Sequence, residues 1–333
     1  MKKSIYLLGM AVAALSSCSQ SDVVEMPENT AIKFNSFVNN NTRTATPVET
    51  TVNNFFVFGE YGSADNNYGT TVFNNEPSTS IHYWEATKFY AFGAYADGEG
   101  GGLKDTEVSF DANTQTLTFT GYAPKKDGKD LIAAVAKHQT DGDVTNETAV
   151  SLPFKHMLSR VKFTFKTTDA DAYTIKISDL KIEGAVSKAT GTYNRTTIDW
   201  SRTSAFDGYA YNVIEDVAKK ESNYTAFDEQ FVIPQESTNN LKVKFTATVS
   251  GLGLVEKSST FEAELGYDPA ATEKGEENTW TPGYIYNYIA TINADQINPD
   301  LEDQKIVFTT TVENWKDANN TDNGELTGTP VQP

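Results

Sequence analysis

Apolar and polar residues alternate regularly in two stretches of the chain. In RVKFTFK, residues 160–166, Val161, Phe163 and Phe165 would face a core while the Lys and Thr residues between them face water. In LKVKFTATV, residues 241–249, every second residue is again apolar. A period of two residues is that of a β-strand with one buried face, so both stretches are predicted to be strands.

Short apolar runs recur between Gly, Asn, Asp and Pro turn signals along the rest of the chain. The clearest are AIKFNSFV (31–38), FFVFGEY (55–61), KFYAFGAY (88–95), TLTFTGY (116–122) and DLIAAVA (130–136), and YTIKISDLKIEGAV, EQFVIP, YIYNYIATI and KIVFTTTVENW follow later. No long segment has a convincing period of 3.6 residues. Many short strands separated by turns predict an all-β protein built from antiparallel β-sandwiches.

The N-terminus has the layout of a secretory signal. Two lysines precede an apolar run at residues 5–15, which is too short to span a bilayer as a helix. The tetrapeptide LSSC at residues 15–18 is similar to a bacterial lipobox, in which a signal peptidase cuts between Ser17 and Cys18. This resemblance implies that residues 1–17 are removed and that Cys18 becomes the lipidated first residue.

Cys18 is the only cysteine of the chain. An ordinary signal peptide with a chance cysteine is the alternative, but the position of this single residue favours lipidation. A catalytic thiol would need a base and a folded pocket around it. We therefore expect an anchor of acyl chains in the outer membrane, followed by a flexible tether at residues 18–30, CSQSDVVEMPENT.

Composition limits the classes of partner. Without residues 1–17, 316 residues remain, enough for two domains, with a soft boundary near residues 150–158. This mature part carries 25 Lys and Arg against 45 Asp and Glu, a net charge of −20, which argues against binding of nucleic acid through its phosphates. A single cysteine permits no internal disulfide, so core packing must supply the stability.

Motifs for catalysis or metal binding are missing. His82, His138 and His156 lie far apart, and the sequence contains no HExxH, GxSxG or CxxC. The stretches DGEGGG at 97–102 and DGD at 141–143 are typical of loops and turns. We therefore expect no enzyme, no cofactor and no metal site, although the many acidic residues leave a glycosidase carboxylate pair open.

An ordered set of short pieces resembles the fimbrillin-like (Mfa-like) lipoprotein family of Bacteroidales. After the lipobox and tether come IKF (32–34), TRT (42–44), FFVFGEY, Trp84 with KFYAFGAYAD, DLIAAVA, LPFKHMLSRVKFTF (152–165), FVIPQ (231–235), Trp280 with PGYIYNYIATI, and VENW ending at Trp315. The most specific piece is LPFKHMLSRVKFTF, which is similar to the family signature F-x-H-x-L-S-R/K. Together the pieces cover most of residues 1–315.

This resemblance implies two tandem transthyretin-like antiparallel β-sandwich domains, at residues 31–155 and 156–318, with a polar tail at 319–333. It also implies a type V pilus subunit that is exported as a lipoprotein and cut by an arginine-specific protease, which removes the first strand. Other pilus subunits would then join by donor-strand addition, in which a strand of the next subunit fills the exposed groove. Such a protein would lie at the cell surface, in a fimbrium or lipid-anchored to the outer membrane, with host or bacterial surface ligands as further partners.

Arg43, followed by Thr44, matches the processing arginine and stands in a polar stretch. It is equally consistent with a solvated loop residue, because tips and anchors of the family are not all processed in this way. After Trp315 the chain offers only Leu326 and Val331 to fill a groove, and it contains two prolines. The polar composition of this tail argues against a C-terminal donor strand and favours a tip, an anchor or a stand-alone adhesin.

A second function stays open, that of a surface glycan-binding lipoprotein in a nutrient-uptake system. It predicts an exposed aromatic platform, with Trp84 or Trp200 stacking on a sugar. Trp280 and Trp315 are predicted to fill cores. His156 is interpreted as a partly buried, hydrogen-bonding residue at the turn between the domains rather than as a ligand or an acid–base group.

Overall fold

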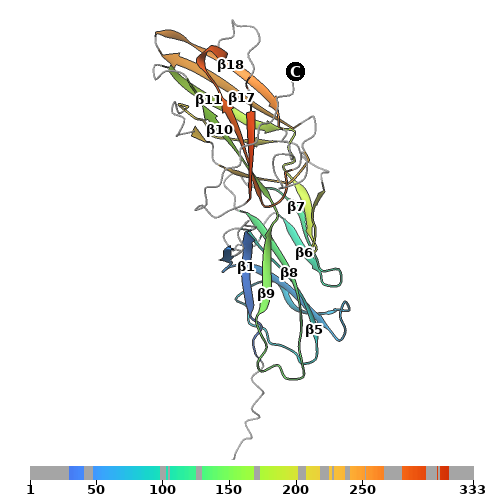
Figure 1. The fold of residues 1–333 in the computed structure, drawn as a ribbon. Coiled ribbons are helices and arrows are strands. Elements are labelled where there is room, and N and C mark those ends of the chain that lie inside the picture. Colours follow the sequence, from blue (N-terminus) through green and yellow to red (C-terminus); the bar gives the residue numbers. More distant parts are fainter. Residues whose placement is uncertain are drawn as a thin grey trace, which may run out of the picture.

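The computed structural model describes residues 30–40, 48–97, 103, 106–124, 130–168, 173–201, 208–217, 225–226, 229–236, 241–251, 253–265, 280–297, 306 and 308–314. Within these ranges almost every element is a β-strand, and the one helix, α1 (Ala294–Ile297), is a single turn. The strands form an elongated molecule with two lobes (Figure 1). The predicted all-β, sandwich-type fold is therefore confirmed.

The N-terminal lobe contains a seven-stranded sheet in the order β2-β1-β9-β8-β5-β3-β4. Its strands are β1 (Phe34–Asn40), β2 (Val48–Thr51), β3 (Phe56–Gly62), β4 (Thr70–Pro77), β5 (Phe89–Asp97), β8 (Leu131–Gln139) and β9 (Val150–His156). β8 and β9 pair only where Ile132 faces His156 and Ala133 faces Lys155. Beyond these pairs the sheet folds over, and residues of β1 and β9 share one buried core with residues of β3, β5 and β8.

A four-stranded sheet in the order β13-β12-β7-β6 packs on the other face of β3, β5 and β8. Its strands are β6 (Glu107–Asp111), β7 (Thr116–Tyr122), β12 (Ala189–Tyr193) and β13 (Ile198–Ser201). The Phe119 ring of this sheet meets the Tyr95 ring of β5 edge-on, with 5.7 Å between the ring centres. β5 is consequently buried on both faces, and this explains its unbroken apolar sequence.

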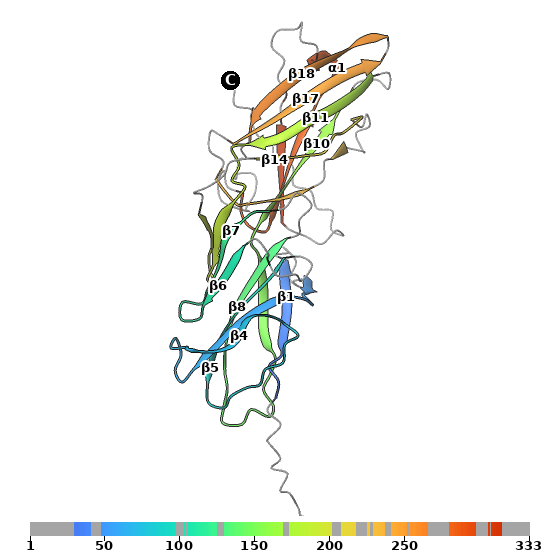
Figure 2. The ribbon, with the colours of Figure 1, turned by 180° about the vertical axis from the view of Figure 1, so that it is seen from behind.

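The C-terminal lobe is a sandwich of two sheets. The first has the order β15-β10-β19-β20, with β16 also paired to β10, and its strands are β10 (Ser159–Lys166), β15 (Thr225–Ala226), β16 (Gln230–Val232), β19 (Tyr284–Thr291) and β20 (Phe308–Asn314). The second sheet has the order β14-β11-β17-β18 and forms one layer in Figure 2. Its strands are β11 (Tyr173–Glu183), β14 (Tyr209–Ala210), β17 (Lys242–Gly251) and β18 (Leu254–Glu264).

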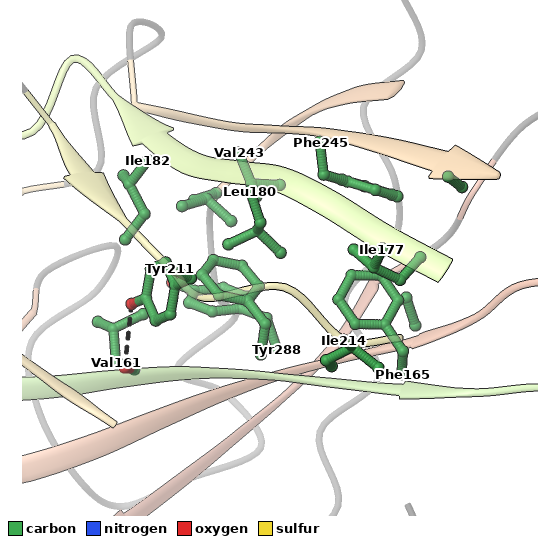
Figure 3. Close-up of a cluster of buried hydrophobic side chains, with 14 of the residues drawn as sticks. Val161, Phe165, Ile177, Leu180, Ile182, Tyr211, Ile214, Val243, Phe245 and Tyr288 are labelled. Atoms are coloured by element: carbon green, nitrogen blue, oxygen red, sulfur yellow. Dashed lines mark hydrogen bonds between the residues drawn. The ribbon is translucent and has the colours of Figure 1, made fainter. Parts of the chain in front are cut away.

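The core of this lobe lies between its two sheets (Figure 3). Val161, Phe163 and Phe165 of β10 are fully buried, as the alternation in the sequence predicts. The hydroxyl of Tyr211 donates a hydrogen bond to the carbonyl oxygen of Val161 at 3.1 Å, so the tyrosine is satisfied inside the core (Figure 3). Trp280 is 1% exposed and fills the same core, which confirms its predicted role, whereas Trp315 lies outside the described residues.

The chain passes between the lobes more than once. β9 ends at His156 in the first lobe and β10 begins at Ser159 in the second. The β12–β13 hairpin then returns to the first lobe, where β12 pairs with β7. Residues 189–201, predicted within the C-terminal domain, therefore lie in a sheet of the N-terminal lobe. A division of the chain at one point cannot describe this arrangement.

Candidate functional site at the first strand

β1 is the first strand of the sequence but occupies an interior place in its sheet. It pairs antiparallel with β2 through residues 37–40 and parallel with β9 through residues 34–38. Figure 1 shows β1 and β9 side by side. Residues 41–47, which connect β1 to β2, include the predicted processing residues Arg43 and Thr44, and these lie outside the described residues.

Alternate side chains of the first segment point into the core. Ile32 is 5% exposed, Ser36 is 8% exposed and Val38 is 7% exposed, whereas Lys33 and Asn35 face solvent. This is the alternation expected of a strand with one buried face. The first strand is thus an integral part of the core and not an outer addition to it.

The ring of Phe34 lies in an aromatic pocket. Its centre is 5.8 Å from that of Phe55, 5.6 Å from that of Phe73 and 5.6 Å from that of Phe92, and all three contacts are edge-to-face. Such pairs prefer this geometry because the positive edge of one ring meets the negative face of the other. Phe34 is therefore the aromatic anchor of the first strand.

Ser36 is the polar member of the inward row. Its hydroxyl donates to the carbonyl oxygen of Val52 at 2.6 Å, and the Val52 N–H donates to the carbonyl oxygen of Ser36 at 3.2 Å. A buried hydroxyl needs such a partner to offset its lost hydration. The first strand thus makes a polar contact as well as apolar ones at this position.

A second segment, residues 82–84, holds the beginning of the first strand; we call it the clasp. The Ile32 N–H donates to His82 O at 2.8 Å, and the Trp84 N–H donates to Thr30 O at 3.3 Å. Another contact comes from the Thr30 N–H, which donates to Val144 O at 3.3 Å. The clasp follows no alternating apolar pattern, so no sequence pattern predicts it.

Two histidine–carboxylate pairs lie in or beside the clasp. His82 Nε2 lies 2.8 Å from Glu76 Oε2, and this hydrogen bond holds the pKa of Glu76 below its usual value. His138 Nε2 lies 2.7 Å from Glu147 Oε2, and its ring centre is 4.4 Å from that of Trp84. Both histidines therefore have structural partners at the places where the sequence left their roles open.

The predicted glycan platform is wrong for Trp84. This side chain is 0% exposed, and its ring meets the Tyr90 ring edge-on with 4.7 Å between centres, so no face is free for a sugar. Trp200 is half-buried, its Nε1–H donates to Met157 O at 2.9 Å, and its ring lies against Gly191. Sugar stacking on Trp200 stays an untested prediction.

His156 lies at the junction of the lobes, where its Nδ1 contacts Asp130 Oδ2. The two side chains are only 12% and 16% exposed. Burial raises the pKa of Asp130, and the charge of His156 opposes that rise. This partly buried pair at the end of β9 agrees with the structural interpretation of His156.

Several predicted features fall outside the described residues, namely Ser17, Cys18 and most of the Gly-rich stretch at 97–102. Among the residues that the structure describes, no group of three or more His, Cys, Asp or Glu side chains could hold a metal ion. In those same ranges no helix has the length and apolar character needed to cross a membrane.

Comparison with known proteins shows the family of the chain. The profile described as fimbrillin-like matches residues 25–315, so the chain belongs to the fimbrillin-like family. Membership supports a role in a fimbria or in cell adhesion at the cell surface, in association with other fimbrial subunits. No curated protein matches the sequence.

Solved structures with a similar chain include a candidate cell adhesion protein from Bacteroides ovatus, with 14% identity over 87% of this chain and 99% of that one and a TM-score of 0.46. A second candidate cell adhesion protein, from Bacteroides eggerthii, has 15% identity over 86% of this chain and 98% of that one, with a TM-score of 0.45. The fimbrial anchor protein Mfa2 from Porphyromonas gingivalis has 13% identity over 89% and 99%, with a TM-score of 0.37.

Proposed function

We propose that this chain is exported as a lipoprotein anchored at Cys18 and becomes a fimbrial subunit through exchange of its first strand. The role is one of assembly and requires no catalysis. The observation that supports it most is the position of β1, which lies between β2 and β9 and fills the core of its lobe. Its covalent link to β2 passes through residues 41–47, which include Arg43.

Cleavage behind Arg43 would leave β1 held by non-covalent contacts alone. Loss of residues 1–43 would then open a slot between β2 and β9, beside the aromatic pocket. Burial of an Ile, Phe or Val side chain contributes about 1.5–3 kcal/mol, so an empty slot is unfavourable. A strand from another chain restores both the main-chain hydrogen bonds and the side-chain packing.

The proposal is tested on surface material sheared from cells that express the chain. Samples run on SDS gels without boiling are probed with an antibody to the chain, and the bands are sequenced from their N-termini. We expect a ladder of resistant oligomers that begin at Thr44. The matched control is Arg43→Lys, which keeps the charge but removes the site for an arginine-specific protease, and it should abolish the ladder.

A single membrane-bound band with an acylated Cys18 terminus in the unaltered chain would contradict strand exchange. That result would still fit a lipid-anchored adhesin.

A further inference from the structure

β1 and β9 are parallel neighbours in the N-terminal lobe. Their register runs from Phe34 opposite Val150 to Val38 opposite Phe154. All other pairs between the described strands of this lobe are antiparallel. Parallel neighbours run in the same direction, so β1 and β9 begin at one end of the lobe and finish at the other.

The chain enters β1 at the end of the lobe that lies away from the C-terminal lobe. Thr30 precedes β1, and its N–H donates to the carbonyl oxygen of Val144, in the loop before β9, at 3.3 Å. β9 ends at His156, and β10 begins the C-terminal lobe at Ser159. Figure 1 shows β1 and β9 side by side below that lobe. Tension between the N-terminus and the C-terminal lobe therefore pulls β1 by its first residue and β9 by its last.

Opposite pulls on two parallel neighbours load their pairing in shear. Each strand is pulled along its own length, so the hydrogen bonds between the strands must all stretch together. In a hairpin that is pulled apart from its open end, the same bonds would break one after another. Bonds that share a load withstand a larger force than bonds that break in turn, and a parallel ladder spaces its bonds evenly along the strands.

We propose that β1 and β9 form a mechanical clamp, which carries tension from an anchored N-terminus to the C-terminal lobe. The clamp consists of the main-chain hydrogen bonds between residues 33–38 and residues 150–154. The inference concerns the uncut chain. It rests on the proposed function only for the source of the tension, which is the lipid anchor at Cys18.

Contacts at the loaded end of β1 resist the same displacement. The Thr30 hydroxyl donates to Thr145 O, and the Ile32 N–H donates to His82 O in the clasp at 2.8 Å. Ile32 is 5% exposed, and the Phe34 ring meets three other aromatic rings edge-on. A slip of β1 along its own axis would pull both side chains out of these places, so packing and hydrogen bonds act together.

Asn35 and Ser151 lie opposite each other in this pairing and separate the clamp from its surroundings. Both side chains are exposed. Because the Val150 N–H donates to Lys33 O, the register directs the Asn35 N–H toward β9 and the Ser151 N–H away from β1. Asn35→Pro therefore removes a hydrogen bond of the clamp, whereas Ser151→Pro removes none of them.

The test pulls single molecules of the full chain at constant force. Cys18 is the only cysteine, so its thiol serves as one attachment point in protein made by cell-free translation without lipid, and a peptide tag at the C-terminus serves as the other. Slipping of β1 frees residues 34–156, which lengthens the molecule by about 400 Å. The lifetime before this step measures the strength of the clamp, because forced unfolding is governed by the unfolding rate.

A second attachment point tests the direction of the load. Gly142 lies in the loop between β8 and β9, and a Cβ there would meet no atom within 4 Å. In Gly142→Cys combined with Cys18→Ser, tension enters β9 through its own chain and does not shear its pairing with β1. The step that frees residues 34–156 should then be absent.

We expect Asn35→Pro to shorten the lifetime at a given force about tenfold, because it removes one bond and leaves Val150 O unpaired. Ser151→Pro and Asn35→Ala should keep the lifetime of the unaltered chain. Equal lifetimes for the two proline variants, or an unchanged step when the chain is pulled from position 142, would overturn the inference.

Thermal unfolding shows whether each variant is folded before it is pulled. If Asn35→Pro does not fold, Thr30→Val still tests the loaded end, because it removes the hydroxyl that donates to Thr145 O. It should shorten the lifetime severalfold, and an unchanged lifetime would contradict the clamp. The pulled chain is uncut and carries no lipid, so a failure of the clamp leaves the proposed function standing, and the gel of sheared material tests that function separately.

Discussion

At the scale of single residues, one ion pair supports the segment that holds the beginning of the first strand. Glu76 contacts His82, whose carbonyl oxygen accepts the Ile32 N–H. The pKa of Glu76 is lowered in the folded protein, so the charged carboxylate favours folding above its unfolded pKa of about 4.3. That contribution is lost as the pH falls through the lower, folded pKa.

We therefore expect Glu76→Gln to lower the melting temperature at pH 7, and this effect to fade as the pH falls through the lowered pKa of Glu76. The Glu76 side chain is 35% exposed, so the loss should be at most about 1 kcal/mol. Thermal unfolding followed by circular dichroism across this pH range measures it. The matched control is Glu107→Gln on the exposed side of β6, and an equal pH dependence in both variants would contradict the assignment to His82.

At the scale of strands, a period of two residues identifies elements with one buried face and misses the others. β10 and β17 were predicted at nearly their observed bounds because Val161, Phe163 and Phe165, and likewise the odd positions of 241–249, face one core. β18 (Leu254–Glu264) escaped because both of its faces are largely polar or exposed. The fold class followed from the alternation, but β18 has no such signal.

β9 shows why the surroundings of a strand matter as much as its composition. Pro153 lies in its middle, where a missing N–H would normally argue against a strand. The Val150 N–H donates to Lys33 O, so residues 150, 152 and 154 donate toward β1 and residue 153 points the other way. On that side β8 pairs only at the end of β9, so the proline breaks no ladder bond.

The site at the first strand was predictable only in part. The apolar alternation of residues 31–38 and the resemblance around Arg43 pointed to the first strand. The clasp and the aromatic pocket could not be found in this way, because Phe34 meets Phe55, Phe73 and Phe92 from three other segments. Such contacts depend on how the sheet folds over between β8 and β9.

The β12–β13 hairpin is one of the elements that join the lobes, and Trp200 contributes to this contact. Trp200 donates to Met157 O at the crossing point and packs beside Val186, Ala189 and Ile233. We expect Trp200→Ala to destabilise the protein by about 3 kcal/mol and to split calorimetric unfolding into two transitions, one for each lobe. The control is Val255→Ala, at a position 81% exposed, which should leave a single transition. If Trp200→Ala also unfolds in a single transition, shifted in temperature, the hairpin does not couple the lobes.

At the scale of the whole molecule, the slot of β1 lies in one of the two lobes of an elongated molecule (Figure 1). A contact between two different surfaces of identical chains is heterologous, and it produces an open filament unless its rotation happens to close a ring. The elongated arrangement of the lobes is suited to such growth.

Growth of such a filament should stop when a free first-strand peptide refills the slot. We expect excess peptide of residues 29–42 to shorten the oligomers formed by the protease-treated chain, because a filled slot can no longer accept a strand of another copy. The length distribution, measured by size-exclusion chromatography with light scattering, should fall as the ratio of peptide to protein rises. The Phe34→Ala form of this peptide should leave the distribution unchanged at the same ratios, since it lacks the ring that enters the pocket of Phe55, Phe73 and Phe92. Equal shortening by both peptides would mean that growth is limited at another surface.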